Sequence, residues 1–232
     1  MKTIFAIFIL MIFSLYPLKS IPNDSGIEAV GGTWIVMKGE HPSIQMEREK
    51  ININVYEKYY DVEAKFIFKN LGDSCSVFMG FPETGGGDIE YNRVDSSRFL
   101  SFSTSVNGKN VEVIRVLAKK DFDDEEYIAY WIKYVSFEKG ETKKVIVKYR
   151  SPLGGRADRH RHFISYNFSG GNWFGKVLES KLNLYFHMPV ELSDDSNKGL
   201  VKKSDRYTYY RTNWEAEEYF YVAYKISGKN EL

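Results

Sequence analysis

The most regular alternation of apolar and polar side chains in the chain lies between residues 51 and 70. Successive side chains of a strand point to opposite faces, so the segment 60–69 would carry one apolar and one charged face. Its apolar side chains are Val62, Ala64, Phe66 and Phe68. With the segment 51–56 before it and a short turn at 57–59, this pattern predicts an antiparallel hairpin with one buried face. Phe66, in the middle of the apolar series, should be among the most buried side chains.

Shorter segments of the same kind, bounded by turn residues, follow along the rest of the chain. We expect strands at 33–37, 44–47, 75–81, 99–106, 109–117, 127–137, 143–149, 162–168, 178–188, 207–212 and 219–226. Asn107-Gly108 predicts a tight hairpin turn, because both positions of such a turn need a positive φ, and 138–142 predicts a second hairpin. Pro82 should end the strand before it, since proline cannot donate to a strand ladder.

These segments predict the fold class. Many short strands separated by turns are typical of an all-β protein, and we predict an antiparallel β-sandwich of immunoglobulin-like type. Helices should be rare, because no long segment keeps the three- and four-residue apolar spacing of a helix. A basic, glycine-containing connection at 151–161 marks a boundary. The predicted organisation is an N-terminal β-sandwich at 21–150 packed with a smaller C-terminal β-sheet at 151–232.

Residues 1–20 have the pattern of a targeting segment. A short positive start, Met1-Lys2-Thr3, precedes an uncharged apolar run at 4–16. Crossing a bilayer takes about 20 apolar residues, whereas the core of a signal peptide needs roughly 7–15. We predict a signal peptide at 1–20 and an extracytoplasmic mature protein, periplasmic, cell-surface or secreted, that leaves the membrane after cleavage. The alternative is an uncleaved membrane anchor, because Leu18 is large for a cleavage site.

The charge balance and the cysteine content limit the classes of partner and the cysteine chemistry that we expect. The chain has 32 Lys and Arg against 31 Asp and Glu, a formal net charge of +1. This balance gives no reason to expect nucleic acid or an anionic membrane surface as a partner. Cys75 is the one cysteine, which excludes an intramolecular disulfide. We expect it to be a small buried side chain, with a reactive or intermolecular thiol as the alternative.

The segment Asp158-Arg159-His160-Arg161-His162 contains the candidate metal ligands. In an extended chain Asp158, His160 and His162 share one face and could present two imidazoles and a carboxylate to a zinc-like ion. The alternative is a solvated connector, because the neighbouring arginines repel a dication. The acidic residues at 121–126 could bind calcium, but a solvated loop is the simpler reading, since the regular spacing of a calcium loop is missing. No motif indicates a cofactor.

Trp173 and Phe174 are the candidate ligand-binding aromatic residues. They follow Ser169-Gly170-Gly171-Asn172, a turn-forming segment that could hold an aromatic pair at the surface. The alternative for Trp173 is packing in the core, because large aromatic side chains usually bury.

Five local patterns stand in a familiar order along the chain. They are Asn23-Asp24-Ser25 with Gly31-Gly32; Val62-x-Ala64-x-Phe66-x-Phe68-x-Asn70; Gly80-Phe81-Pro82; Phe137 to Thr142 followed by Tyr149; and Tyr166, Gly170, Trp173 and Gly175. In this order they resemble a family of exported bacterial proteins catalogued as domain of unknown function 4424. The chain departs from the family where Glu83 and Thr84 stand in place of a second proline. The resemblance implies an exported β protein and supplies no catalytic residues.

The function predicted from these observations is binding. The sequence contains no Gly-x-Ser-x-Gly elbow, no Cys-His pairing and no phosphate-cradling glycine loop that leads into a helix. We therefore expect an exported non-catalytic envelope or surface protein that binds a protein or glycan partner. The alternative is an extracytoplasmic hydrolase that acts on glycan or peptide, because paired carboxylates are set by the fold and not by spacing. The oligomeric state stays open.

Overall fold

A computed structural model describes residues 25–30, 33–36, 39–84, 97–117, 127–155, 162–169, 172–194, 196, 199–215 and 217–227. Every regular element within them is a strand, so the prediction of an all-β protein is confirmed there. The longer strands are β3 (Ile44–Val55), β4 (Tyr59–Asn70), β5 (Cys75–Thr84), β9 (Tyr127–Phe137), β10 (Thr142–Pro152), β12 (His162–Ser169), β13 (Val177–Phe186), β16 (Tyr207–Trp214) and β17 (Glu217–Ile226). The shorter ones are β1 (Ser25–Val30), β2 (Thr33–Val36), β6 (Ser101–Val106), β7 (Lys109–Asn110), β8 (Ile114–Leu117), β11 (Gly154–Gly155), β14 (Val190–Leu192) and β15 (Val201–Lys202). This part of the chain contains no apolar helix of membrane-spanning length.

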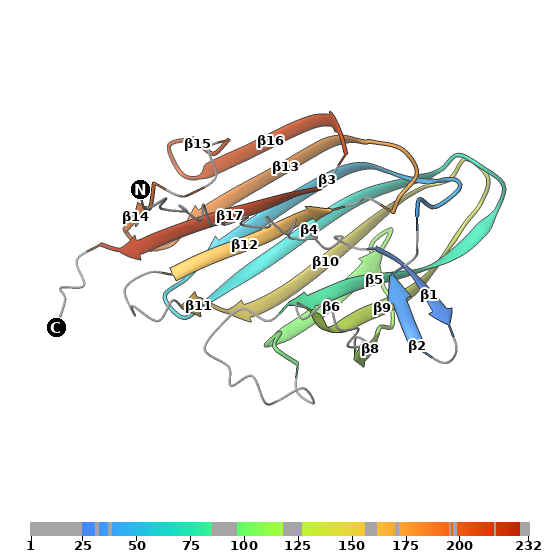
Figure 1. Cartoon of the computed structure of the whole chain (residues 1–232), viewed down its shortest axis with the longest axis horizontal. Helices are drawn as coiled ribbons and strands as arrows, with labels where there is room; N and C mark the ends of the chain where they lie inside the picture. The colour runs from blue at the N-terminus through green and yellow to red at the C-terminus, as the bar shows by residue number, and fades with distance from the viewer. Residues whose placement is uncertain are drawn as a thin grey trace, which may run out of the picture.

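The largest sheet has eight strands in the order β15-β16-β13-β3-β4-β10-β6-β7 (Figure 1). Its centre is the antiparallel hairpin of β3 and β4, which the alternation predicted, and β10 pairs with β4 on the other side. β13 runs parallel to β3, so the sheet is mixed and the prediction of antiparallel pairing throughout is wrong at this place. Parallel neighbours need a long crossover, and here the intervening chain also builds strands of two other sheets.

The large sheet has one apolar and one polar face. On β4 the apolar side chains are Val62, Ala64, Phe66 and Phe68, all at most 2% exposed. The face to which they point is called the inner face below. Phe66 is fully buried, as predicted. The opposite face, called the outer face, carries Asp61, Glu63, Lys65, Ile67 and Lys69 on the same strand, all partly exposed.

Two smaller antiparallel sheets pack against the inner face (Figure 1). One has the strand order β2-β1-β5-β9-β8 and the other β11-β12-β17-β14. The ring centroid of Phe81 on β5 lies 5.4 Å from that of Tyr149 on β10, and the centroid of Phe168 on β12 lies 5.6 Å from that of Tyr209 on β16. The hydrophobic core therefore lies between the large sheet and the two small ones. None of the described strands forms a second layer over the outer face.

Three local predictions about the strands need correction. The segment 109–117 is two strands, because β7 extends the large sheet whereas β8 pairs with β9 in the five-stranded sheet. β9 and β10 do not form the predicted hairpin, since they belong to different sheets. β5 continues through Pro82 to Thr84. β1 pairs with β5 only as far as Gly80, so one side of β5 has no paired strand at Pro82 among the described residues.

The turn between β6 and β7 is as predicted. Asn107 has a φ of 50° and Gly108 a φ of 80°, so both central positions are in the left-handed region. This is the geometry that a two-residue hairpin loop needs to follow the twist of its strands.

The boundary predicted at residue 150 lies inside β10, and strands from both sides of it share the large sheet. The division into an N-terminal sandwich at 21–150 and a C-terminal sheet at 151–232 stays a prediction. The predicted signal peptide at 1–20 lies outside the described residues. Cys75, at the start of β5, is half-buried and packs against the core.

Candidate functional site

Of the three predicted metal ligands, His162 lies within the described residues, whereas Asp158 and His160 lie outside them. The ring centroid of His162 is 5.6 Å from that of Tyr224 on β17. Its Nδ1 is buried and makes no hydrogen bond in the described part of the chain. The same part contains no group of three His, Cys, Asp or Glu side chains that could hold an ion. Metal binding by Asp158, His160 and His162 stays a prediction, and the acidic residues at 121–126 lie outside the described residues.

The two predicted ligand-binding aromatic residues differ in exposure. Trp173 is 1% exposed, and its ring centroid lies 4.9 Å from that of Phe68 in the core. Phe174 is 40% exposed, and its backbone N–H donates to the carbonyl of Ile44 at 2.7 Å, which ties this turn to β3. Trp173 thus packs in the core, as in the alternative interpretation. Of the pair, only Phe174 has a side chain that is exposed to a ligand. Ligand binding by this pair stays a prediction.

His41 fixes the other side of the same turn. Its backbone N–H donates to the carbonyl of Asn172 at 2.8 Å. Its Nδ1 accepts hydrogen bonds from the backbone N–H groups of Ser43 at 3.1 Å and Ile44 at 2.9 Å. Nδ1 can accept only while it carries no proton, so the structure needs a neutral imidazole. Burial lowers the pKa of His41 below its ordinary value.

This lowered pKa predicts a loss of stability in mild acid. The unfolded chain takes up a proton at His41 near pH 6.5, about the ordinary value, whereas the folded chain does so only at lower pH. The stabilisation is therefore fully present above about pH 6.5 and is lost as the pH falls toward the pKa of the folded state. Urea unfolding at pH 7.5 and 5.5 should show a smaller decrease in stability for His41→Asn than for the wild type. Equal decreases would contradict this role of His41.

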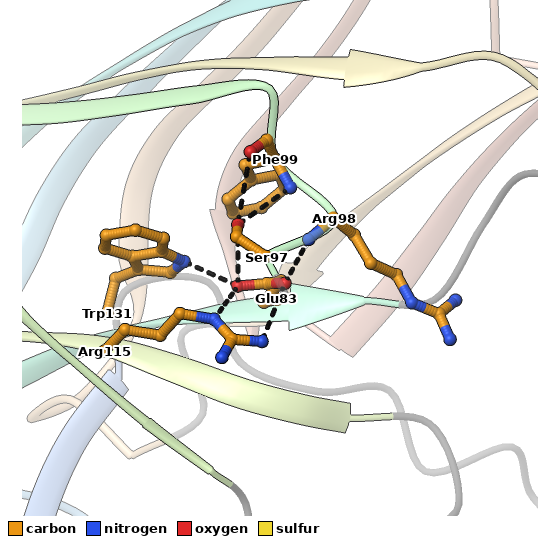
Figure 2. A network of polar contacts seen from close by, with 6 residues as sticks. All are labelled: Glu83, Ser97, Arg98, Phe99, Arg115 and Trp131. Carbon is orange, nitrogen blue, oxygen red and sulfur yellow. Dashed lines mark hydrogen bonds and ion pairs between the residues drawn. The ribbon is translucent and has the colours of Figure 1, made fainter. Parts of the chain in front are cut away.

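Glu83, near the end of β5, is a fully buried carboxylate surrounded by donors (Figure 2). Nε and Nη2 of Arg115 donate to it at 2.9 and 3.2 Å, and Nε1 of Trp131 donates at 2.8 Å. The backbone N–H of Arg98 donates at 2.6 Å, and the hydroxyl of Ser97 lies 3.3 Å away. A carboxylate has about four lone-pair sites, so these donors satisfy it.

The contacts of Glu83 join parts of the chain that are far apart in sequence. Arg115 belongs to β8, Trp131 to β9, and Arg98 to the segment that leads into β6. One carboxylate therefore fixes three segments against the end of β5, and this arrangement is called the Glu83 clamp below. Sequence reasoning missed it. The only signal was a single carboxylate directly after Phe81-Pro82, whose donors come together only in the fold.

The outer face of the large sheet presents an ordered row of polar side chains. The hydroxyl of Thr208 on β16 lies 3.3 Å from Oδ1 of Asn183 on β13 and donates to it. Nδ2 of Asn183 donates to Oδ1 of Asn52 on β3 at 2.9 Å. These three side chains, called the amide ladder below, span three neighbouring strands. Because each group holds the next in place, the ladder is fixed before any partner arrives.

Ion pairs order the neighbouring part of the outer face. Nε and Nη2 of Arg150 on β10 donate to the two carboxylate oxygens of Asp61 on β4 at 2.7 and 2.9 Å. Glu63, two residues further along β4, pairs with Lys65 at 2.6 Å and with Lys148 at 3.0 Å. Burial acts to raise the pKa of Glu63, but the hydrogen bonds and charges of the two lysines outweigh it and lower that pKa. The outer face is therefore a polar surface with positioned side chains.

Comparison with known proteins gives a likeness of fold. No family model matches the sequence, and no curated protein matches it either. A solved structure of a suggested nutrient-binding protein from Legionella pneumophila is similar, with a TM-score of 0.69 and 17% identity. The similarity covers 89% of this chain and 72% of that one.

Two enzyme structures match less well. An M1 zinc metallopeptidase from Deinococcus radiodurans has a TM-score of 0.41 at 6% identity, over 79% of this chain and 43% of that one. Leukotriene A4 hydrolase from Saccharomyces cerevisiae has a TM-score of 0.45 at 8% identity, over 78% and 29%. The chain spans less than half the length of these two enzymes. The likeness to the Legionella protein, at 17% identity, is one of fold.

Proposed function

We propose that this chain is an exported, non-catalytic protein of the cell envelope or cell surface that binds a protein or glycan partner through the outer face of its large sheet. The observation that carries the proposal is the amide ladder of Thr208, Asn183 and Asn52 on a face without a second layer among the described strands. Polar groups that are already ordered on strands lose little conformational freedom when a partner binds.

Two resemblances support the proposal. The fold is like that of the suggested nutrient-binding protein from Legionella pneumophila, which favours a binding role by analogy of fold. The ordered sequence patterns, with Val62 to Asn70 and Gly80-Phe81-Pro82 among them, favour membership of the exported family catalogued as domain of unknown function 4424. An immunoglobulin-like sandwich is the finer description of the fold that we propose with it.

Export predicts a shortened N-terminus. Mass spectrometry of the protein from its host should find the mature chain beginning between Leu18 and Asn23, because a signal peptidase acts just after an apolar core of this length. Recovery of the intact Met1 start in a soluble cytoplasmic fraction would overturn export.

Binding is tested by removing groups from the amide ladder. Retention of the mature protein on an envelope preparation from its host should fall about tenfold in the double variant Asn52→Ala with Thr208→Val, because each lost hydrogen bond is worth about 0.5–1.5 kcal/mol. The matched control is Ser76→Ala, which removes a surface hydrogen bond of 2.8 Å to the Ser136 hydroxyl on the five-stranded sheet. Equal retention of the double variant and the wild type would contradict the proposal.

The same preparation separates binding from hydrolysis. If the chain is non-catalytic, incubation with envelope glycans and peptides should release no new reducing ends or amines above the level of a heat-denatured sample. Turnover that a single carboxylate substitution abolishes would replace the binding proposal by the hydrolase alternative.

A further inference from the structure

The strand register places three lysines side by side on the outer face. Lys181 on β13 stands opposite Lys50 on β3, and Lys50 stands opposite Lys65 on β4. Paired strands lie about 4.8 Å apart, so three ammonium groups attach to the sheet within a span of about 10 Å. These three residues are called the lysine row below.

The lysine row is unfavourable for folding. Like charges directly opposite each other on neighbouring strands repel and destabilise the pair. Lys65 has a carboxylate partner in Glu63, which it shares with Lys148. Lys50 and Lys181 have no ion-pair partner within the described residues. The row therefore opposes folding, and only the Glu63 carboxylate compensates its charge. A bound anion would supply the missing negative charge.

The side chains around the lysine row carry more positive than negative charges. On β13, β3, β4 and β10 the outer face carries eight basic side chains, Arg48, Lys50, Lys65, Lys69, Lys144, Lys148, Arg150 and Lys181. The acidic ones are four, Asp61, Glu63, Glu179 and Glu47, the last at the bulge of β3. These four strands therefore give the outer face an excess of four positive charges, although the whole chain has a net charge of only +1. The folded chain thus concentrates positive charge on this surface.

The next row of the same face offers neutral hydrogen-bonding groups. Asn183 lies two residues from Lys181 on β13, and Asn52 lies two residues from Lys50 on β3, so the amide ladder runs alongside the lysine row. Alternate residues of a strand are about 6.7 Å apart. Asn183 is only 3% exposed and holds its two neighbours in place, whereas Asn52 and Thr208 are partly exposed, so these two supply the hydrogen-bonding groups that a ligand can reach. Tyr210, opposite Lys181 on β16, adds a half-exposed ring beside the row.

We infer that the outer face binds an anionic polysaccharide. Its carboxylate or phosphate groups lie over the lysine row, and its hydroxyls bond to the amide ladder. The inference rests on the proposed function, since it names the chemistry of the partner for the same face. A glycan is favoured over a nucleic acid because it offers hydroxyls in the same repeat as the anionic groups, and the two neighbouring rows match that combination.

The test uses polygalacturonate as the anionic glycan, dextran as the neutral glycan and a single-stranded DNA oligonucleotide as the other polyanion. Binding to polygalacturonate should exceed binding to the other two, and it should weaken by about tenfold or more between 50 and 200 mM salt, because counterions are released. Lys50→Gln with Lys181→Gln should weaken it by about tenfold, since each phosphate or carboxylate contact is electrostatic. Lys203→Gln with Lys225→Gln, two exposed lysines elsewhere, should bind as the wild type does.

A second readout separates lost binding from lost folding. Because Lys50→Gln with Lys181→Gln removes the repulsion within the row, its urea midpoint should be higher than that of the wild type. Polygalacturonate should raise the midpoint of the wild type more than that of this variant. A variant that binds polygalacturonate as tightly as the wild type, or DNA bound as tightly as polygalacturonate, would overturn the inference.

The outcomes distinguish this inference from the proposed function. If the ladder variant loses retention on the envelope preparation while the lysine variant keeps it, the outer face binds a partner that is not anionic, and only the inference fails. If the ladder variant keeps its retention, the proposed function fails as well.

Discussion

Replacing Glu83 by glutamine should lower the free energy of unfolding by about 3–5 kcal/mol, the range measured when one partner of a buried ion pair is removed. Glu83 is fully buried and receives Arg115 through two hydrogen bonds and Trp131 through a third. A carboxamide has the same shape but loses one acceptor oxygen and the negative charge. The Arg115 guanidinium would then face an N–H group in place of a carboxylate oxygen. Urea unfolding of Glu83→Gln and the wild type measures the difference.

The control for this change is an ion pair at the surface. Asp73 pairs with Lys139 at 2.9 Å, but the two side chains are 90% and 76% exposed. Such pairs contribute about 0–1 kcal/mol, so Asp73→Asn should stay within about 0.5 kcal/mol of the wild type. If Glu83→Gln is as mild as Asp73→Asn, the Glu83 clamp does not hold β5, β8 and β9 together.

Truncating Phe66 to alanine should cost about 3–5 kcal/mol, because the transfer energy of the ring is lost and a cavity is left behind. Phe66 is fully buried on the inner face, opposite Val145 of β10, and its ring centroid lies 5.9 Å from that of Phe68. The cost is a large part of the roughly 5–15 kcal/mol by which domains are stable. A urea melt of Phe66→Ala should therefore show a partly unfolded or barely stable protein.

Lys65→Ala is the matched control, one residue away on the outer face. It should stay within about 0.5 kcal/mol of the wild type, as surface substitutions usually do. If Lys65→Ala is the damaging change and Phe66→Ala is mild, the two faces of β4 are exchanged. A shift of one residue in the register of β4 would produce that result and would also move Lys65, the member of the lysine row on β4, to the inner face.

The sequence predicted those parts of the fold that depend on local pattern. The alternation in β4 identified the inner side chains, Phe66 among them, because a half-buried strand needs that period. Asn107-Gly108 identified its turn because both residues have the positive φ that the turn requires. Both features can be predicted without knowing which distant strand pairs with the segment.

The errors arose where a partner far away in sequence decides the outcome. Pro82 lies within a strand because β1 leaves that side of β5 unpaired, and no local pattern reports this. β13 joins β3 in parallel, which depends on the path of more than a hundred residues between them.

The candidate sites were hidden for the same reason. The alternation showed that Lys50, Lys65 and Lys181 are polar positions, but only the register of β3, β4 and β13 brings them into one row. Balanced charges along the chain also concealed the positive excess of the outer face. Likewise, the donors to Glu83 come from segments 14 to 48 residues away.

Site-specific photo-cross-linking tests most directly whether the outer face is the binding surface. A photoreactive amino acid is placed at Ser103 or Lys148, both exposed on the outer face, and for comparison at Ser136 or Tyr134, both exposed on the five-stranded sheet. After irradiation in the host envelope, we expect an envelope partner to be joined at Ser103 and Lys148 and not at Ser136 or Tyr134. Cross-links at Ser136 and Tyr134 alone would contradict the account.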